Sequence, residues 1–444
     1  MAAPTLRALV REARTASGGA LVLAVAIPFV FLHPKYQPSL AHGSVGINLT
    51  DLALAAVVVA GLWTLRRDGP AALAAQPVLW GFFAVFLIWL VASIAWATHH
   101  DPNYPLHSRV VSAFKYVEFA LLAPAAAVVV RKSADRSALL FSIVAWSSFL
   151  TAIAALQFLG IVNEFEGRRP VQREPSYIGI HELGVFSGVA LTIAFASILI
   201  VRRPRLGWIG GIAGTLGVAL AAALDAVGGI VVAAVGVAAV AARRGLLDLR
   251  RVAILAAIVA AVAAASVTLR GSAVSAFLEF LGVTPSNTQT NENVQSYSHR
   301  TLLGYIGLRI WLDHPIAGAG WQESHEPAAF EKHLAAAHRR FPDEPDVAFP
   351  SRAHRWGVQN GIIQTLADLG AVGLILLGVV IACALRVALR VARAADEERA
   401  HTAIVALGGL VVAVAVFTGT GLLPGTSVEA MLWLTVGLCA SLAV

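Results

Sequence analysis

Four arginines of this chain stand close to the ends of long apolar runs, where a guanidinium group could meet an anionic ligand. A guanidinium group stays charged, pairs with phosphate through two hydrogen bonds and tolerates partial removal from water. Any one of these arginines also fits a side chain that reaches toward lipid headgroups. Because they precede several different runs, we interpret them as a pocket for a phosphorylated ligand. They are Arg173, Arg300, Arg352 and Arg355.

Three further residues could accept or donate a proton near these arginines. His354 lies beside Arg355, and imidazole is the side chain that titrates near neutral pH. Glu182 follows His181 at the start of an apolar run, and Asp225 lies in the turn L-D-A-V-G-G. Both carboxylates also suit an ordinary helix start. We therefore expect His354 to be the catalytic base, with Glu182 and Asp225 as the next candidates.

The composition indicates which solvent surrounds the elements that carry these residues. The chain has 444 residues, of which 58% are hydrophobic and 13% are charged. Soluble domains carry about 25% charged residues. The two cysteines, Cys383 and Cys439, both lie inside apolar runs, so the pattern indicates neither a disulfide framework nor a zinc site. We expect a membrane protein without a metal or a cofactor.

The apolar residues form about twelve uninterrupted runs, each near the length of about 20 residues that a membrane-crossing helix needs. Continuous runs favour helices over the alternating strands of a barrel. The sequence thus predicts an all-α polytopic membrane protein with about twelve transmembrane helices. The runs are 17–33, 48–65, 77–98, 110–130, 137–161, 181–201, 206–223, 226–242, 252–269, 369–392, 402–419 and 424–443.

Lys and Arg residues predict how the chain is oriented, because they collect in cytoplasmic loops. With the N-terminus in the cytoplasm, nineteen of them fall in cytoplasmic segments and five in the short outer loops. The net charge of +7 therefore reflects membrane insertion, and we expect no nucleic-acid partner. Both termini fall in the cytoplasm. Spans one to nine occupy 1–269, a large external loop occupies 270–356, and spans ten to twelve occupy 357–444.

The large loop divides into segments of different character. The apolar segment 272–282 should lie along the membrane surface, and the polar segment 284–298 reads as a connector. Periodic residues predict a helix over 299–312 and a short surface helix over 326–340. The remainder, 341–356, is rich in Pro, Arg and His and should be irregular.

Two motifs in and after this loop resemble those of a known family. Residues 298–321 read S-H-R-T-L-L-G-Y-I-G-L-R-I-W-L-D-H-P-I-A-G-A-G-W, and residues 359–374 read Q-N-G-I-I-Q-T-L-A-D-L-G-A-V-G-L. They resemble the signature of bacterial O-antigen ligases and O-antigen polymerases, whose outer loop carries an arginine, a helix and a D-H-P-x-x-G-x-G turn before an H-N-x-x-L run. The segment R-E-P-S-Y-I-G-I-H-E-L-G at 173–184 loosely resembles the arginine-containing stretch before span six.

The resemblance implies an enzyme that takes a glycan from a polyprenyl-diphosphate carrier. Such enzymes transfer it to a hydroxyl of an acceptor glycan, with inversion and without a metal, on the outer side of the bacterial cytoplasmic membrane. Outer arginines hold the diphosphate, and the histidine of the H-N pair is the proposed base. Arg300 matches the loop arginine and Arg173 matches the one before span six. Asn360, Gly370 and Gly373 match the run after the H-N pair.

The chain departs from the family pattern at two places. Gln359 stands where the family has its histidine, and glutamine cannot accept a proton as a base. The family's S-R-G at the start of span eight is replaced by D-A-V-G, which begins at Asp225. These departures favour a polymerase or a divergent glycosyltransferase over a ligase.

The residues and the resemblance together predict a membrane glycosyltransferase of the GT-C type. Its partners would be the lipid-linked glycan donor, a glycan or glycolipid acceptor, and the bilayer. Trp321 is a candidate for stacking on a sugar face, although a tryptophan at the membrane interface is the simpler interpretation. Gln359 and Asn360 are expected to contact substrate alongside the arginines.

Two other functions fit a chain of this kind. A transporter or flippase for lipid-linked glycans would place its polar residues near the middle of the membrane, at broken helices. Here most of the polar residues lie at the predicted outer ends of the spans. A cell-wall polymerase of the shape-and-division type would use a similar lipid-diphosphate donor. The arrangement of the arginines around an outer cavity separates these possibilities.

Overall fold

The computed structural model describes residues 15–37, 47–162, 170–200, 204–271, 297–394 and 396–443. Within these ranges the structure is helical, with no β-strand. The predicted surface segment at 272–282 and nearly all of the connector at 284–298 lie outside the described residues. The helices are α2 (Gly18–Val30), α3 (Leu49–Asp68), α4 (Ala71–Ala74), α5 (Pro77–His100), α6 (Leu106–Ala120), α7 (Leu122–Val129), α8 (Ser133–Phe158), α9 (Ile180–Leu199), α10 (Pro204–Ala221), α11 (Leu224–Arg243), α12 (Leu249–Leu269), α14 (Tyr297–Asp313), α15 (Pro327–Arg340), α16 (Gly361–Ala394), α17 (Glu397–Thr420) and α18 (Ser427–Ser441), with short 3₁₀ turns at Pro34–Tyr36, Glu323–His325 and Asp346–Ala348.

Over the described residues, nine helical stretches are long and apolar enough to cross a membrane. The helices α2, α10 and α18 are apolar but shorter. Each predicted apolar run coincides with one of these twelve stretches, so the prediction of an all-helical protein suited to a membrane is confirmed. The fourth run forms two helices, α6 and α7, because Pro124 has no N–H to donate to the preceding turn.

Helices α9 and α17 lie at the centre of the bundle. In the most apolar stretch of α9, 89% of the residues are buried inside the protein, against 17% for the peripheral α12. Helix α9 packs against α10, α17 and α11, and α17 also packs against α16 and α18. Glycines bring α10 close to α9: a Cβ at Gly214 would lie 2.8 Å from the backbone of Ser187 and of Leu191. The start of α9 is therefore held firmly among its neighbours.

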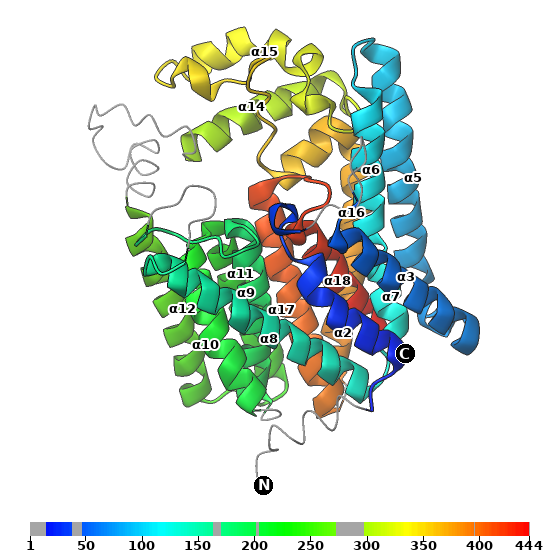
Figure 1. Ribbon diagram of the computed structural model, residues 1–444, viewed down its shortest axis with the longest axis vertical. Helices are drawn as coiled ribbons and strands as arrows, with labels where there is room; N and C mark the ends of the chain where they lie inside the picture. Colours follow the sequence, from blue (N-terminus) through cyan, green and yellow to red (C-terminus); the bar gives the residue numbers. More distant parts are fainter. Residues whose placement is uncertain are drawn as a thin grey trace.

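Helices α14 and α15 lie across one end of the bundle, which we call the capped end (Figure 1). Helix α14 packs against α15 and against α16. The helices predicted at 299–312 and 326–340 are thus confirmed, and 341–356 contains only one short turn, at Asp346–Ala348. The start of α9 and the end of α17 also reach the capped end, because His181 and Gly419 contact Arg300 of α14, and the start of α11 follows through the contact of Asp225 with His181.

A glycine-rich turn joins the cap to α16 at a break in that helix. Gly370 has a left-handed φ of 68°, which interrupts the helix. The turn at 315–320 fills the gap: Ala319 and Gly320 donate backbone hydrogen bonds to Ala367 and Asp368, at 2.8 and 2.9 Å. A Cβ at Gly370 would lie 2.1 Å from the carbonyl oxygen of Ile316, so only glycine fits there. The D-H-P-I-A-G-A-G-W turn therefore anchors the cap to the bundle.

Candidate functional site

The starts of two neighbouring helices and the cap helix bring three polar side chains together. His181, in the first turn of α9, has its Nδ1 atom 2.7 Å from Oδ2 of Asp225, in the first turn of α11. The NH2 group of Arg300, on α14, lies 3.2 Å from Nε2 of the same imidazole. The NH1 group of Arg300 donates to the carbonyl oxygen of Gly419, near the end of α17, at 2.7 Å. We call Arg300, His181 and Asp225 the arginine–histidine cluster.

The contacts of His181 determine where its proton lies. A guanidinium group can only donate, so Nε2 of His181 must be the acceptor for Arg300. Nδ1 then carries the proton and donates to Asp225, which fixes both the tautomer and the orientation of the ring. In this arrangement the Nε2 lone pair of His181 is directed at the side chain of Arg300. An imidazole held by a carboxylate in this way is the arrangement of a general base.

Two other arginines approach the same part of the capped end. Arg173 precedes Glu174, whose backbone N–H donates to Leu220 at the end of α10, at 2.9 Å. The NH1 group of Arg270 lies 3.5 Å from the carbonyl oxygen of Ala222, in the same turn before α11. The segments that carry Arg173 and Arg270 therefore both contact the residues just before α11.

A second group of polar residues joins the cap to α6, and we call it the loop anchor. Arg109, at the start of α6, donates to Gln322 and to Glu326, which precedes α15. Glu326 also accepts a hydrogen bond from Arg355 at 2.7 Å. The Glu326 side chain is only 4% exposed, whereas that of Arg355 is 49% exposed. The carboxylate of Glu326 is thus held between two arginines, and these arginines hold the loop in place.

Trp321 belongs to this anchor and lies in the core. It is fully buried, its Nε1 donates to the hydroxyl of Ser112 at 2.8 Å, and its carbonyl oxygen accepts from the hydroxyl of Tyr104 at 2.6 Å. A ring without an exposed face cannot stack on a sugar. This corrects the expectation that Trp321 contacts the glycan: its indole secures the cap to the bundle.

Two ionisable residues of the turn at Glu323–His325 lie beside the anchor, Glu323 buried and His325 half-buried. Burial, with help from nearby Asp101 and Glu326, raises the pKa of Glu323 to about 8. Burial and the charge of Arg109 lower the pKa of His325 to about 4. Nε2 of His325 accepts from the side-chain amide of Gln364 at 3.1 Å, so His325 is a neutral packing residue at physiological pH.

One short segment connects the two clusters. Gly419 accepts from Arg300, and three residues later the N–H of Leu422 donates to the side chain of Gln364 at 2.7 Å. A chain of three residues spans at most about 10 Å. Residues 419–422 therefore link the arginine–histidine cluster to Gln364, which contacts His325 beside the anchor.

The residues after the cap have structural roles that their sequence pattern did not reveal. Asn360 caps α16, because its side-chain oxygen accepts from the N–H of Ile363 at 3.0 Å. Gln359, the preceding residue, is half-buried. Arg352 is exposed and forms a two-pronged ion pair with Glu331 of α15, at 2.7 and 3.3 Å.

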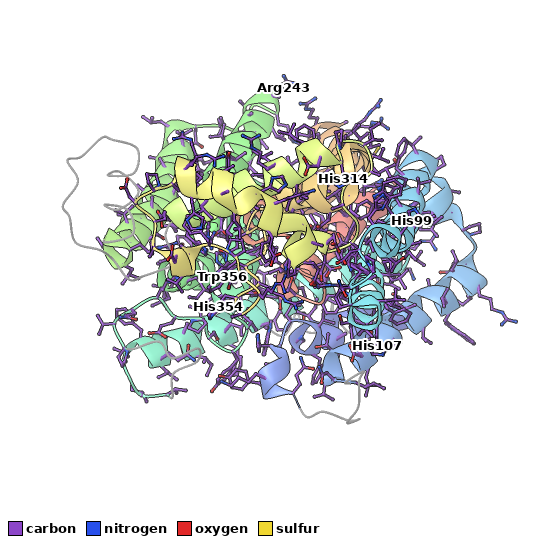
Figure 2. The ribbon with its side chains drawn as sticks, turned by 90° about the horizontal axis from the view of Figure 1, so that it is seen from above. His99, His107, Arg243, His314, His354 and Trp356 are labelled. Carbon is purple, nitrogen blue, oxygen red and sulfur yellow. The ribbon has the colours of Figure 1, made fainter. Side chains whose placement is uncertain are left out.

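His354, the expected base, lies on the surface of the capped end. Its ring stacks on Trp356, with centroids 6.1 Å apart, and both residues lie together when the protein is seen from above (Figure 2). Trp356 in turn contacts the ring of His299, the neighbour of Arg300, at 5.3 Å. Within the described residues, the rings of Trp356 and His299 therefore connect His354 to the neighbourhood of Arg300. His181, in contrast, is held directly by the carboxylate of Asp225.

Glu182 also has a local role at the start of α9. A Cβ placed on Gly179 would lie 2.2 Å from its carboxylate oxygen, so the side chain folds back over the beginning of its own helix. A carboxylate there is stabilised by the helix dipole. Of the three expected acid–base residues, Asp225 is the one that the described structure brings into the cluster with Arg300.

The cluster also contains residues that sequence reasoning left aside. The sequence pattern marks His181 only as a neighbour of Glu182, and Arg109 and Arg270 only as basic residues of the loops. Among the described residues, no three His, Cys, Asp or Glu side chains gather in a way that could hold a metal ion. No protein-family model matches this chain, and no curated protein matches it either.

Proposed function

We propose that the chain is a metal-independent, inverting glycosyltransferase of the O-antigen polymerase and ligase type. It would act on the outer face of the bacterial cytoplasmic membrane, with about twelve crossings, both termini in the cytoplasm and the capped end outside. Its donor would be a glycan carried on a polyprenyl diphosphate. The acceptor would be a sugar hydroxyl of a second glycan or glycolipid.

The observation that carries this proposal is the contact of Arg300 with His181, whose ring is also held by Asp225, at the capped end. Among the described residues, Arg300 donates to the imidazole of His181 and to the carbonyl oxygen of Gly419, and it is paired directly with no carboxylate. A guanidinium group that is not paired directly with a carboxylate keeps its charge for an incoming anion. A diphosphate is the anion that the resemblance to the polymerases and ligases implies.

In the proposed reaction the arginines bind the leaving group. Arg300 would turn from His181 to the diphosphate oxygens, and Arg173 and Arg270 would add charge from the α10–α11 side. Negative charge grows on the diphosphate as its bond to the first sugar breaks, and fixed cations stabilise that charge most strongly in the transition state. Because a diphosphate is already a good leaving group, no nucleotide is needed.

His181 is the base that we propose in place of the family histidine. Once Arg300 has moved to the diphosphate, Nε2 of His181 can accept the proton of the acceptor hydroxyl. The acceptor oxygen forms its bond to the anomeric carbon as the carbon–oxygen bond to the diphosphate breaks. Asp225 stabilises the resulting imidazolium. This assignment explains how the chain can work with Gln359 where the family has its histidine.

The proposal is tested with the purified, reconstituted protein and an undecaprenyl-diphosphate-linked oligosaccharide. Chain extension or transfer to an added acceptor glycan is followed by gel. We expect product from the native protein and a loss of about 100-fold in turnover for Arg300→Ala. The matched control is Arg309→Ala, which removes an exposed arginine from the same helix and should leave turnover unchanged. Absence of product from the folded native protein, or full turnover by Arg300→Ala, would overturn the proposal.

A further inference from the structure

A groove runs from the arginine–histidine cluster along the outside of the helix bundle. It has a volume of about 410 Å³ and lies between α11, α16 and α17. Apart from Asp225 and Thr418 at one end, its walls consist of Gly, Ala, Val, Ile and Leu side chains. Val232 on its rim is 60% exposed, so the groove opens sideways, toward the lipid that surrounds such a bundle. The lining residues are Asp225, Gly228, Gly229, Val232, Ile381, Leu385, Val411, Val414, Ala415 and Thr418.

The polar end of the groove coincides with the proposed reaction site. Asp225 lines the groove and also holds His181. Thr418 lines it as well, and the next residue, Gly419, accepts the hydrogen bond from Arg300. From Asp225 to Val232 the wall formed by α11 descends about 10 Å, at 1.5 Å per residue. An anionic head at Arg300 would therefore have an apolar channel leading away from it into the membrane.

Two adjacent glycines of α11 have different surroundings in this groove. Gly229 is packed against α17, because a Cβ there would lie 2.8 Å from the Cβ of Ala415. Gly228 is exposed, and a Cβ there would meet no atom within 4 Å. Packing therefore accounts for Gly229 but not for the open space beside Gly228. That space widens the groove directly below Asp225.

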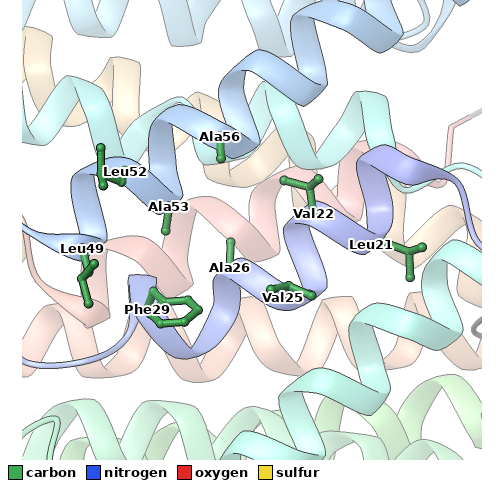
Figure 3. A pocket seen from close by; sticks show the side chains of 9 residues that line it. All are labelled: Leu21, Val22, Val25, Ala26, Phe29, Leu49, Leu52, Ala53 and Ala56. Carbon is green, nitrogen blue, oxygen red and sulfur yellow. The ribbon is translucent and has the colours of Figure 1, made fainter.

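A second apolar pocket shows what distinguishes this groove. The pocket between α2 and α3 is slightly larger, about 460 Å³, and all nine of its lining residues are apolar (Figure 3). It has no charged residue among those that line it, so it offers nothing to hold an anionic head. The groove below Asp225 has an apolar wall and a polar end, and Arg300 lies next to that end through its contacts with His181 and Gly419.

We propose that the groove between α11, α16 and α17 binds the isoprenoid tail of the donor while its diphosphate lies at Arg300. This inference rests on the proposed function and adds the route by which the donor enters from the membrane. The tail is a methyl-branched hydrocarbon, and the groove would hold it by van der Waals packing against the apolar side chains of α11, α16 and α17. The diphosphate would then be held at a fixed height relative to His181.

The test uses undecaprenyl diphosphate that carries a diazirine on the isoprene unit next to the diphosphate. The full chain in lipid nanodiscs is irradiated, and the labelled peptides are identified by mass spectrometry. We expect labels on α11, α16 and α17, at residues that line the groove. Gly228→Leu should fill the open space and weaken labelling by about tenfold, equivalent to about 1.4 kcal/mol.

A matched control lies on the same helix. A Cβ at Gly236 would likewise meet no atom within 4 Å, and Gly236 does not line the groove, so Gly236→Leu should label like the native protein. If Gly228→Leu fails to fold, Val232→Trp and Val235→Trp replace the pair. Both valines are exposed, at 60% and 66%, but only Val232 lines the groove. The thermal unfolding midpoint of each variant reports whether it has folded.

The outcomes separate the groove from the proposed function. Labels outside the groove, with glycan transfer still lost in Arg300→Ala, would overturn the groove and leave the enzyme proposal standing. Displacement of the probe by excess phosphatidylglycerol would identify an ordinary lipid crevice and also overturn the groove. The absence of both labelling and transfer in the folded protein would overturn both proposals. Groove labels that Gly228→Leu weakens and Gly236→Leu retains would support the inference.

Discussion

Arg300 and Arg109 both lie at the capped end, but their guanidinium groups meet different partners. Arg109 donates to the buried carboxylate of Glu326, which a second arginine, Arg355, also contacts. Arg300 donates to an imidazole nitrogen and a backbone carbonyl. Glu326 therefore neutralises the charge of Arg109 directly. Within the part of the chain that the structure describes, Arg300 is connected to the carboxylate of Asp225 through the ring of His181.

We use this difference in bonding partners to divide the arginines of the capped end into structural arginines and proposed ligand-binding arginines. A carboxylate fixed between two arginines satisfies its hydrogen bonds in place and would be costly to rearrange. An arginine that bonds neutral groups can exchange them for an anion and gain a stronger, charge-assisted bond. In our proposal the loop anchor holds the cap, and the arginine–histidine cluster carries out the chemistry. Each of the following experiments tests one side of this division.

The largest effect is expected from His181, on the reactive side of the comparison. Removing a general base costs about 10²–10⁴-fold, so His181→Ala should lose about 1,000-fold in transfer rate. His107→Ala, which removes an exposed histidine at the start of α6, is the control and should keep full activity. Transfer is measured with the lipid-linked oligosaccharide. Loss of activity in His354→Ala together with normal activity in His181→Ala would move the base to the surface of the cap.

Asp225 should act through His181 and not independently. Asp225→Ala should lower the transfer rate less than His181→Ala, and the double variant should be no slower than His181→Ala alone. The reason is that a carboxylate that only orients a ring has nothing to act on once the ring is gone. The rates of the two single variants and the double variant form the measurement. Additive losses would mean that the two side chains have separate functions.

The structural side of the comparison should respond in stability. Arg109→Ala leaves the buried carboxylate of Glu326 without its main partner, and breaking a buried pair costs about 3 kcal/mol. The measurement is the thermal unfolding midpoint of the purified protein. Arg352→Ala breaks the exposed pair with Glu331 and should leave the midpoint unchanged. Equal midpoints for both variants would show that Arg109 does not hold the cap.

The break in α16 offers a smaller test of the same anchor. Gly370→Ala places a Cβ against the carbonyl of Ile316 at a left-handed φ and should destabilise the protein by about 2 kcal/mol. Gly378 lies in the same helix with open space around it, and Gly378→Ala should stabilise by up to about 1 kcal/mol. Limited proteolysis of the α14–α15 cap, read together with the unfolding midpoint, should show earlier cleavage only in Gly370→Ala.

The smallest effect concerns the pH dependence of the anchor. The folded protein keeps the proton of Glu323 up to a pH of about 8, while the unfolded chain loses it near 4.5. The contribution of this residue to stability therefore falls as the pH rises from about 4.5 to about 8 and stays level above that range. Glu323→Gln removes this loss and should gain about 1–2 kcal/mol over the native protein between pH 5 and 8. Unfolding midpoints that move in parallel with pH would contradict the burial of this carboxyl group.

Local pattern determined the helices of this protein. Uninterrupted apolar runs predict membrane-length helices because a lone helix satisfies its own backbone, whatever its neighbours are. Periodic residues likewise predict α14 and α15, and the resemblance at 298–321 draws attention to Arg300. The lengths of the apolar runs did not, however, predict the break at Gly370 inside the run 369–392. The break at Gly370 depends on a turn fifty residues earlier that supplies the missing hydrogen bonds.

The tertiary structure alone decided which polar residues share a site. His181, Asp225 and Arg300 are far apart in the sequence, and each is at or near a helix start, where His, Asp and Arg are all ordinary. Their meeting follows from how α9, α11 and α14 pack, which no periodicity records. The same packing buried Trp321 and left His354 at the surface, and residue type alone predicted neither position. Helix formation is local in the chain, but the chemistry at helix ends depends on which ends are brought together.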